Sequence, residues 1–359
     1  MDSLSQALLG SAIQGSLLGR QQGRRSLVYG ALLATLPDLD VIVRYGDPVS
    51  TMTYHRGFSH SVFVLTALAA LMAWLIRRRW PDAPYGGWRL FLTLWLVLIT
   101  HPLLDAFTIY GTQLFWPLAP TPASWSAVFI VDPVYTLPLL GAVLAAAIRG
   151  PARWRRGMLG ALAFSTAYLF FGLGGRLYAE QRVQAALDAQ GIAVTELRAL
   201  PTPYNTLVWR TLAKTADGHY YEAISSSFDR GPPEWVRHPR GLELASALDD
   251  VPQHQRLRWF TDDWLRYDLI GSALVVSDMR MGVPGLYTFR FEMARCDAAG
   301  VLVPVTPAGW PSRMGGNAEV RAIFQRIVRQ QPPLPLAAWA APHFGPVDGR
   351  ATSCQPASP

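Results

Sequence analysis

The chain has 359 residues, of which 50% are hydrophobic and 16% are charged, and its formal net charge is +7. A soluble domain usually carries about 25% charged residues, so this composition argues against an ordinary soluble protein. A basic chain can bind nucleic acid. Here, however, the arginines gather at the ends of apolar runs, where the positive-inside rule already accounts for them, and we expect no nucleic-acid partner.

Six apolar segments occupy the first half of the chain. They cover residues 4–18, 27–43, 58–76, 90–109, 134–148 and 158–174. Several are near the length of roughly 17–25 residues that spans a bilayer. The first is short and rich in small residues, so it either spans or lies re-entrant against its neighbours. The fold class we predict is an α-helical multi-pass membrane domain of about five or six hydrophobic helices over residues 1–175.

Basic residues mark alternate ends of these segments. The groups are Arg20 to Arg25, Arg77 to Arg79, and Arg149 to Arg156. If all three face the cytoplasm, the spans alternate consistently. The opposite ends, which carry most of the aspartate and histidine residues of this half, then face outward. The same topology places the remainder of the chain outside.

A small α+β soluble domain is predicted for residues 176–330. Its strand-like runs cover residues 206–213, 219–225, 256–259, 273–276 and 287–292. Asp217-Gly218 is a typical hairpin turn between the first two. The tail, 331–359, is rich in proline and alanine and is predicted to be extended or disordered. Cys296 and Cys354 are either one disulfide, if the tail is extracytoplasmic, or two free thiols.

Two pairs of polar residues interrupt the apolar segments. His101 and Asp105, at i and i+4, share one helix face; they could bind a metal, or hydrogen-bond to join two helices. Asp38 and Asp40 follow Pro37, and in an extended stretch they point the same way. That pair invites a cation, or else it caps a terminating helix.

The sequence His55-Arg56-Gly57-Phe58-Ser59-His60 adds two more histidines at the same end. Gly57 allows a tight turn that would let both imidazoles converge, and an arginine suits phosphate or carboxylate. Asp132 precedes Pro133 and is either an N-terminal cap or a functional carboxylate. Together the six residues Asp38, Asp40, His55, His60, His101 and Asp105 are our predicted metal ligands. Such nitrogen and oxygen donors favour Zn²⁺, with Mn²⁺ as an alternative, over calcium.

Several motifs occur in an order that resembles a known family. They are Met-Asp-Ser-Leu at 1–4, Pro-Asp-Leu-Asp at 37–40, His-Arg-Gly-Phe-Ser-His-Ser at 55–61, Thr-His-Pro-Leu-Leu-Asp at 100–105, Tyr-Gly-Thr-Gln-Leu-Phe-Trp-Pro at 110–117 and Val-Asp-Pro at 131–133. This pattern resembles the bacterial inner-membrane metal-dependent hydrolases described as LexA-binding or LexA-regulated. The resemblance covers residues 1–175.

That family is thought to be distantly similar to zinc-dependent phospholipase C and P1-type nucleases. The resemblance therefore implies hydrolysis of a phosphoester by metal-activated water. Because the protein is expected in the membrane, we expect a membrane lipid or a lipid-derived phosphoester as substrate. Arg56 and Asp132 are the predicted catalytic residues: Arg56 would stabilise phosphoryl oxygens, and Asp132 would orient a ligand or act as base. The resemblance also implies a bacterial inner-membrane location, with the metal site and C-terminal domain periplasmic by the charge pattern.

One position departs from the family pattern. Family members usually read Thr-His after the opening residues, whereas this chain has Ser5-Gln6, so a ligand-type histidine is replaced by a poorer ligand. A link to LexA comes from the family label alone. The alternative function is a non-catalytic membrane protein whose polar cluster is structural and whose soluble domain binds a partner.

Overall fold

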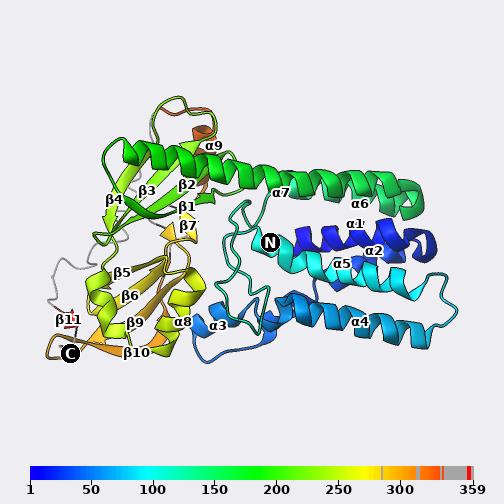
Figure 1. Cartoon of the computed structure of the whole chain (residues 1–359), viewed down its shortest axis with the longest axis horizontal. Coiled ribbons are helices and arrows are strands. Elements are labelled where there is room, and N and C mark those ends of the chain that lie inside the picture. Colours follow the sequence, from blue (N-terminus) through cyan, green and yellow to red (C-terminus); the bar gives the residue numbers. More distant parts are fainter. Residues whose placement is uncertain (284–285, 313–315, 332–333, 335–353, 357–359) are drawn as a thin grey trace. The chain divides into compact units, whose positions relative to one another are not determined.

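The computed structural model describes the chain except for residues 284–285, 313–315, 332–333, 335–353 and 357–359. It divides into two compact units (Figure 1). The first contains residues 1–43, 54–173 and 203–205, and the second contains residues 44–53, 174–202 and 206–359. Most of the tail that we predicted to be extended or disordered lies outside the described residues.

The first unit is helical. Its elements are α1 (Ser3–Gln22), α2 (Arg25–Ala34), the 3₁₀ turns η1 (Pro37–Ile42) and η2 (Phe58–His60), α4 (Val62–Arg79), α5 (Gly87–Ala106), α6 (Pro133–Arg149) and the first part of α7 (Pro151–Asp188). α3 (Pro48–Tyr54) falls almost wholly in the second unit. One cluster of buried apolar side chains holds α1, α2, α4, α5 and α6 together.

Local sequence explains where these helices begin. The Ser61 hydroxyl accepts from the backbone N–H groups of Phe63 and Val64 at the start of α4, and Pro133 occupies the first turn of α6. Both are standard N-terminal signals. Gly10 of α1 and Gly30 of α2 face each other so closely that a Cβ on either would overlap the other's backbone. Small residues of this kind let membrane helices approach.

The predicted number of five or six hydrophobic spanning helices is wrong. Among the described residues, two helices are long and apolar enough to cross a membrane, α5 and α7, and a third candidate combines residues 48–60 with α4 across a bend of 45°. α2 and α6 are apolar but have only 10 and 17 residues. α1 has 20 residues, but serine and glutamine make it too polar.

α7 is one uninterrupted helix of 38 residues. We had expected an apolar segment over 158–174 and a separate soluble domain beginning at residue 176. The residues at this boundary, including Gly174 and Gly175, stay helical. The domain boundary therefore falls inside a helix rather than in a linker.

The second unit holds two main sheets. The four-stranded antiparallel sheet runs β1 (Val194–Pro201), β2 (Val208–Thr215), β3 (His219–Ser226), β4 (Glu234–Pro239). The other has the order β11 (Gln355–Pro356), β10 (Val301–Gly309), β9 (Arg290–Cys296), β6 (Ala273–Asp278), β5 (Leu265–Ile270), and is antiparallel except for the β10–β11 pair. Two short strands, β7 (Gly282–Val283) and β8 (Leu286–Tyr287), pair separately. The described helical elements are η3 (Leu242–Leu248), α8 (Pro252–Thr261) and α9 (Asn317–Arg326).

These sheets agree with the predicted α+β class and correct it in one place. β2 and β3 form the expected hairpin, with Gly218 at φ +76° in its turn. The predicted strand over 256–259 is instead part of α8, because Pro252 starts a helix there. Cys296 and Cys354 are joined by a disulfide, which decides between the two alternatives left open by the sequence.

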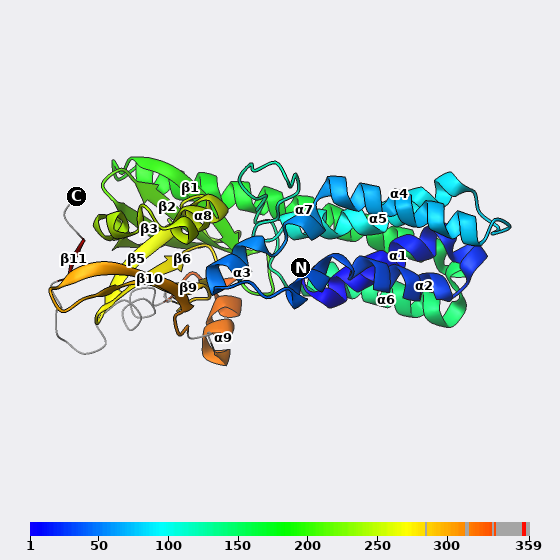
Figure 2. The same cartoon turned by 90° about the horizontal axis from the view of Figure 1, so that it is seen from below.

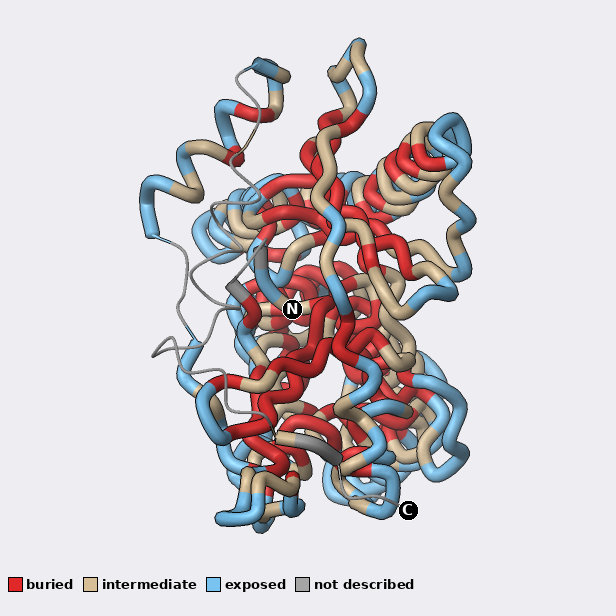
Figure 3. Tube along the Cα trace, turned by 90° about the vertical axis from the view of Figure 1, so that its left-hand side faces the viewer, coloured by how far each residue is buried: buried red, intermediate tan, exposed pale blue. Residues whose placement is uncertain are grey.

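Burial in the second unit includes many charged side chains. All six residues of β6 are buried, and Figure 3 colours such stretches red. Arg210 on β2 and Glu222 on β3 form an ion pair, and each is 1% exposed. Removing one member of such a pair leaves an uncompensated buried charge, which is strongly destabilising.

We therefore expect Glu222→Gln to lower the free energy of unfolding by about 3–5 kcal/mol. The matched control is Arg237→Gln, which breaks an exposed pair with Asp217 and should cost about 0–1 kcal/mol. Denaturant unfolding of the full chain in detergent measures both. Equal losses in the two variants would contradict the importance of the buried pair.

Candidate metal centre

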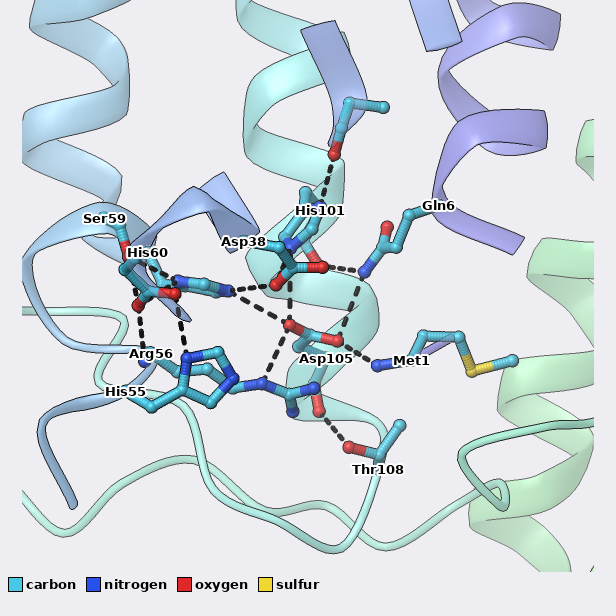
Figure 4. A network of polar contacts seen from close by, with 12 residues as sticks. Met1, Gln6, Asp38, His55, Arg56, Ser59, His60, His101, Asp105 and Thr108 are labelled. Carbon is cyan, nitrogen blue, oxygen red and sulfur yellow. Dashed lines mark hydrogen bonds and ion pairs between the residues drawn. The ribbon is translucent and has the colours of Figure 1, made fainter. Parts of the chain in front are cut away.

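Three elements of the helical unit bring four ligand-type side chains together. Asp38 comes from η1, His60 from η2, and His101 and Asp105 from the end of α5 (Figure 4). One nitrogen or oxygen of each lies within 4.8 Å of the others. α4 and α5 lie side by side in Figure 1 and Figure 2. The group therefore forms where the start of α4 meets the end of α5.

The spacing of the ligand atoms is that of a small coordination polyhedron. His60 Nε2 lies 3.4 Å from Asp38 Oδ1 and 3.2 Å from Asp105 Oδ2. His101 Nε2 lies 3.2 Å and 3.5 Å from the same two oxygens. A tetrahedral ion bound at about 2.0–2.2 Å by nitrogen and oxygen has ligand–ligand edges of about 3.3–3.6 Å. These four distances match such edges, and the two remaining pairs of ligand atoms lie within 4.8 Å of each other.

Hydrogen bonds on the outer side of each imidazole fix its tautomer. His101 Nδ1 lies 2.5 Å from the carbonyl oxygen of Ala34, which can only accept, so Nδ1 carries the proton. Ser59 Oγ donates to Asp40 Oδ2 at 2.8 Å and lies 2.9 Å from His60 Nδ1. Since the carboxylate can only accept, the serine accepts from His60. Both Nε2 lone pairs then face the centre, as metal-binding histidines require.

The Asp38 carboxylate is held in its ionised form. Burial alone would raise its pKa, but the neighbouring imidazoles of His101 and His60 outweigh that effect and hold the pKa well below its usual range. Its side chain keeps 22% exposure, whereas the side chains of His60, His101 and Asp105 have none. Asp38 therefore marks the side from which the centre can be reached.

Asp40 organises the loop beside the centre rather than joining the four ligand atoms. Its Oδ1 lies 2.9 Å from His55 Nδ1, and its Oδ2 accepts from the backbone N–H of Arg56 at 3.1 Å. Arg56 has φ +62°, in the left-handed region that costs a non-glycine residue energy. Asp40 stabilises that conformation, and the Arg56 guanidinium is thereby directed at Asp105, with Nε 3.2 Å from Oδ2.

Asp105 also receives donors from the N-terminal segment. The amine of Met1 and the Gln6 amide, at 3.2 Å, both contact its Oδ1. Gln6 also donates to the carbonyl of His101 at 3.2 Å. The glutamine that stands in place of the family histidine thus lies at the centre. It orients a ligand there through its amide.

Several buried atoms around the centre make no hydrogen bond to any described residue. They are Gln6 Oε1, Arg56 Nε and Nη1, His60 Nε2 and Asp105 Oδ2. Buried polar groups are normally satisfied, so this concentration needs a missing partner. A cation bound to the two histidines and two aspartates would satisfy His60 Nε2 and Asp105 Oδ2. The donor set therefore fits a divalent metal.

The sequence-predicted residues separate into three groups. Asp38, His60, His101 and Asp105 form the four-atom set among the described residues. Asp40, His55 and Arg56 lie in the network around it. Sequence reasoning missed the Met1 amine and the Ala34 carbonyl.

Asp132 has a different environment. Its Oδ1 accepts from the backbone N–H groups of Val134 and Tyr135, and its Oδ2 accepts from the Tyr168 hydroxyl at 3.0 Å. Burial raises its pKa, and these hydrogen bonds partly offset the effect. The carboxylate thus caps the N-terminus of α6, and its catalytic role stays a prediction.

The half of the chain that contains the candidate centre also matches a protein-family model. Residues 1–179 match the model of the YdjM inner membrane protein family. The helical unit therefore carries a sequence pattern of that inner-membrane family, as the resemblance to LexA-regulated membrane proteins led us to expect. The further likeness to phospholipase C and P1-type nucleases stays a prediction.

Two individual proteins are also similar to this chain. The chain is 39% identical over 93 residues to inner membrane protein YbcI of Escherichia coli, a match that covers 26% of this chain and 52% of that protein. It is 24% identical over 259 residues to the uncharacterized protein YfhP of Bacillus subtilis, covering 66% of this chain and 74% of that protein. The chain thus spans about half the length of YbcI. No solved structure matches.

The hydrogen bond from His60 to Ser59 generates a prediction about affinity. Ser59→Ala removes the group that fixes the His60 tautomer, and loss of such outer contacts typically costs 10–100-fold in metal affinity. We expect a loss of about that size in competition with a chromophoric chelator. Ser50→Ala is the control, because Ser50 also bonds an aspartate, Asp47, outside the network. An unchanged affinity in Ser59→Ala would refute the tautomer argument.

Proposed function

We propose that this YdjM-type protein is a membrane-bound metal-dependent hydrolase that acts on a phosphoester, such as a phospholipid head group. Residues 1–179 carry the inner-membrane family pattern. Asp38, His60, His101 and Asp105 would hold the ion, which we propose is zinc because four nitrogen and oxygen donors at tetrahedral spacing suit it. When bound, such an ion supplies Lewis acidity and lowers the pKa of a coordinated water.

The observation that carries this proposal is the state of Arg56. Its guanidinium is buried beside the centre, where Nε forms an ion pair with Asp105 Oδ2 at 3.2 Å without hydrogen-bond geometry and Nη1 has no hydrogen-bond partner among the described residues. The ring of Tyr110 lies against it, 4.9 Å from Cζ. A buried guanidinium whose Nη1 donor has no acceptor is costly, and phosphate oxygens are the acceptors that its planar fork matches best. Arg56 would bind the phosphoryl group and stabilise its charge.

His55 is the residue best placed to move a proton. Because Asp40 Oδ1 can only accept, the 2.9 Å contact puts the imidazole proton on Nδ1 and leaves Nε2 to accept or donate one. Aspartate-oriented histidines are the usual general acid–base groups. The His55 side chain is 22% exposed and its ring lies 5.9 Å from that of His60. We propose proton transfer for His55, oriented by Asp40, in place of direct metal binding by these two residues. For Asp132 we propose a structural role as the N-cap of α6.

A lipid-borne substrate is supported by the surface next to the centre. Leu39, Val41 and Ile42 of η1 and Phe58 of η2 are all more than half exposed. Exposed apolar residues in such a group indicate contact with a membrane or partner. A phosphoester held in a bilayer could therefore approach from the side that Asp38 leaves open. The charge pattern still predicts multi-pass insertion with this end in the periplasm.

A second function is favoured by one specific observation. Four protein ligands already complete a tetrahedron, and closed sites are typical of structural metals, whereas catalytic sites keep a position open. In this second function the ion holds η1, η2 and α5 together, and the protein catalyses no reaction at the centre. Both proposed functions require the bound metal, but only the hydrolase requires Arg56 to bind a phosphoryl group.

The metal itself is the first test. We expect about one equivalent of zinc in the detergent-purified protein. We expect Asp38→Asn to lower that content at least about tenfold, since a ligand contributes more than its supporting contacts. Elemental mass spectrometry measures both, with Asp47→Asn as control because Asp47 caps α3 outside the centre. An absence of metal from the parent protein, even after reconstitution, would remove both readings.

A variant of Arg56 distinguishes the catalytic function from the structural one. In metal-loaded protein we expect Arg56→Gln to reduce phosphoester hydrolysis by about 10²–10³-fold, the usual cost of one transition-state donor. Phosphorus NMR of short-chain phosphatidylglycerol follows the reaction, and metal content is measured on the same samples. Arg20→Gln is the charge-matched control. If the metal-loaded parent hydrolyses no phosphoester, the structural reading is the correct one.

A further inference from the structure

A second site lies at the other end of the helical unit. A cavity of about 1000 Å³ opens there, with walls from α1, α2, α4 and α5, and the loop between α4 and α5 closes its end. Leu36, between α2 and η1, and Leu94 of α5 are the lining residues nearest in sequence to the candidate metal centre, and Arg25 and Arg79 lie at the opposite end. Nothing in the proposed hydrolase uses this space.

The inner part of the cavity is apolar. The lining side chains there are Leu32 and Leu33 from α2, Leu36 from the turn after it, Met72 and Ile76 from α4, and Leu90 and Leu94 from α5. Arg25 and Leu33 are eight residues apart along α2, which corresponds to about 12 Å at 1.5 Å per residue, and Leu36 extends the apolar wall beyond the end of that helix. One leaflet of a bilayer has a hydrocarbon thickness of about 15 Å. The apolar part thus has the length of an acyl chain in one leaflet.

The outer end has the opposite character. Arg25 and Arg79 both line it, and Asp82 is the one acidic residue among the lining side chains. The Arg25 guanidinium makes no hydrogen bond or ion pair to any described residue, while Arg79 stacks on the Trp80 ring, 5.2 Å from its centre. Two arginines beside one aspartate leave an excess of positive charge, which suits a phosphate group.

Two glutamines add a different kind of recognition. Gln14 is 2% exposed and lines the cavity, and its Oε1 has no hydrogen-bond partner among the described residues. The buried Oε1 of Gln21, also in the lining, is unpartnered too. A carbonyl oxygen can only accept, so these two atoms call for a ligand that donates hydrogen bonds. Hydrocarbon alone would leave them unsatisfied.

We propose that this cavity binds one glycerophospholipid whose head group carries hydrogen-bond donors. One acyl chain lies along Leu32, Leu33 and Leu94, and the phosphate contacts Arg25 and Arg79. A hydroxyl or ammonium group of the head group donates to the glutamine oxygens. The lipid is a bound component and not the hydrolysed substrate, since its phosphate lies at the end of α5 remote from His101.

Native mass spectrometry of delipidated protein in detergent tests this. Phosphatidylglycerol, phosphatidylethanolamine and phosphatidylcholine are added separately. We expect one bound lipid, with the first two retained at least about tenfold better than phosphatidylcholine, whose head group has no donor. Glycerol phosphate without acyl chains should not compete. No stoichiometric lipid, or equal retention of all three, would overturn the proposal.

Matched variants locate the lipid. Arg25→Gln/Arg79→Gln should lower its occupancy at least about tenfold, and Gln14→Leu should abolish the preference over phosphatidylcholine. Arg20→Gln/Arg78→Gln removes the same charge from residues outside the lining and should leave occupancy unchanged. Equal loss in both arginine pairs would show non-specific attraction and refute the site. Metal content should not change in any of these variants, so failure here is distinguishable from failure of the metal proposal.

Discussion

The fully buried carboxylate of Asp105 constrains the whole helical unit. An ionised carboxylate without partners is very costly away from water, and the chain meets that cost from four directions. The amine of Met1 and the amide of Gln6 contact one oxygen, while Arg56 and His60 contact the other. The start of α1, the loop before α4 and the end of α5 are thus held in one place. The metal centre is the point at which these requirements meet.

The same constraint explains why a cation fits. Donors fully occupy the outer oxygen of Asp105, while its inner oxygen and His60 Nε2 lack good hydrogen bonds. Asp38 and Asp40 add two more carboxylates to the network, so negative charge exceeds what Arg56 and the terminal amine offset. Protonating both imidazoles would offset the charge as well. It would still leave the four inner atoms with fewer contacts than a single divalent ion gives them.

Much of the centre could be predicted from sequence, because its residues stand at the ends of apolar runs where ionisable groups are expensive. The choice between Asp38 and Asp40, or between His55 and His60, could not. It depends on how η1 and η2 turn, and that is set by the contacts of Asp40 with Ser59 and the Arg56 backbone. The span count failed for a related reason. α1 packs against α2 and α5 within the helical unit although it is polar for a membrane span. Counting apolar segments by length therefore overestimated the number of helices that cross the membrane.

The two ends of the helical unit differ in chemistry in a way that follows from the helices themselves. α5 ends at His101 and Asp105 among carboxylates and imidazoles, and it begins near Leu90 beside arginines and glutamines. A single antiparallel neighbour, α4, carries His60 just before its first residue and Arg79 at its last. A ligand at one end therefore meets the histidine and aspartate side chains of the candidate metal centre. A ligand at the other end meets arginines that suit a phosphate group, next to an apolar cavity. Because α4 and α5 form a wall of both sites, a lipid that holds these helices together at their basic ends would also restrain the positions of His60 and His101.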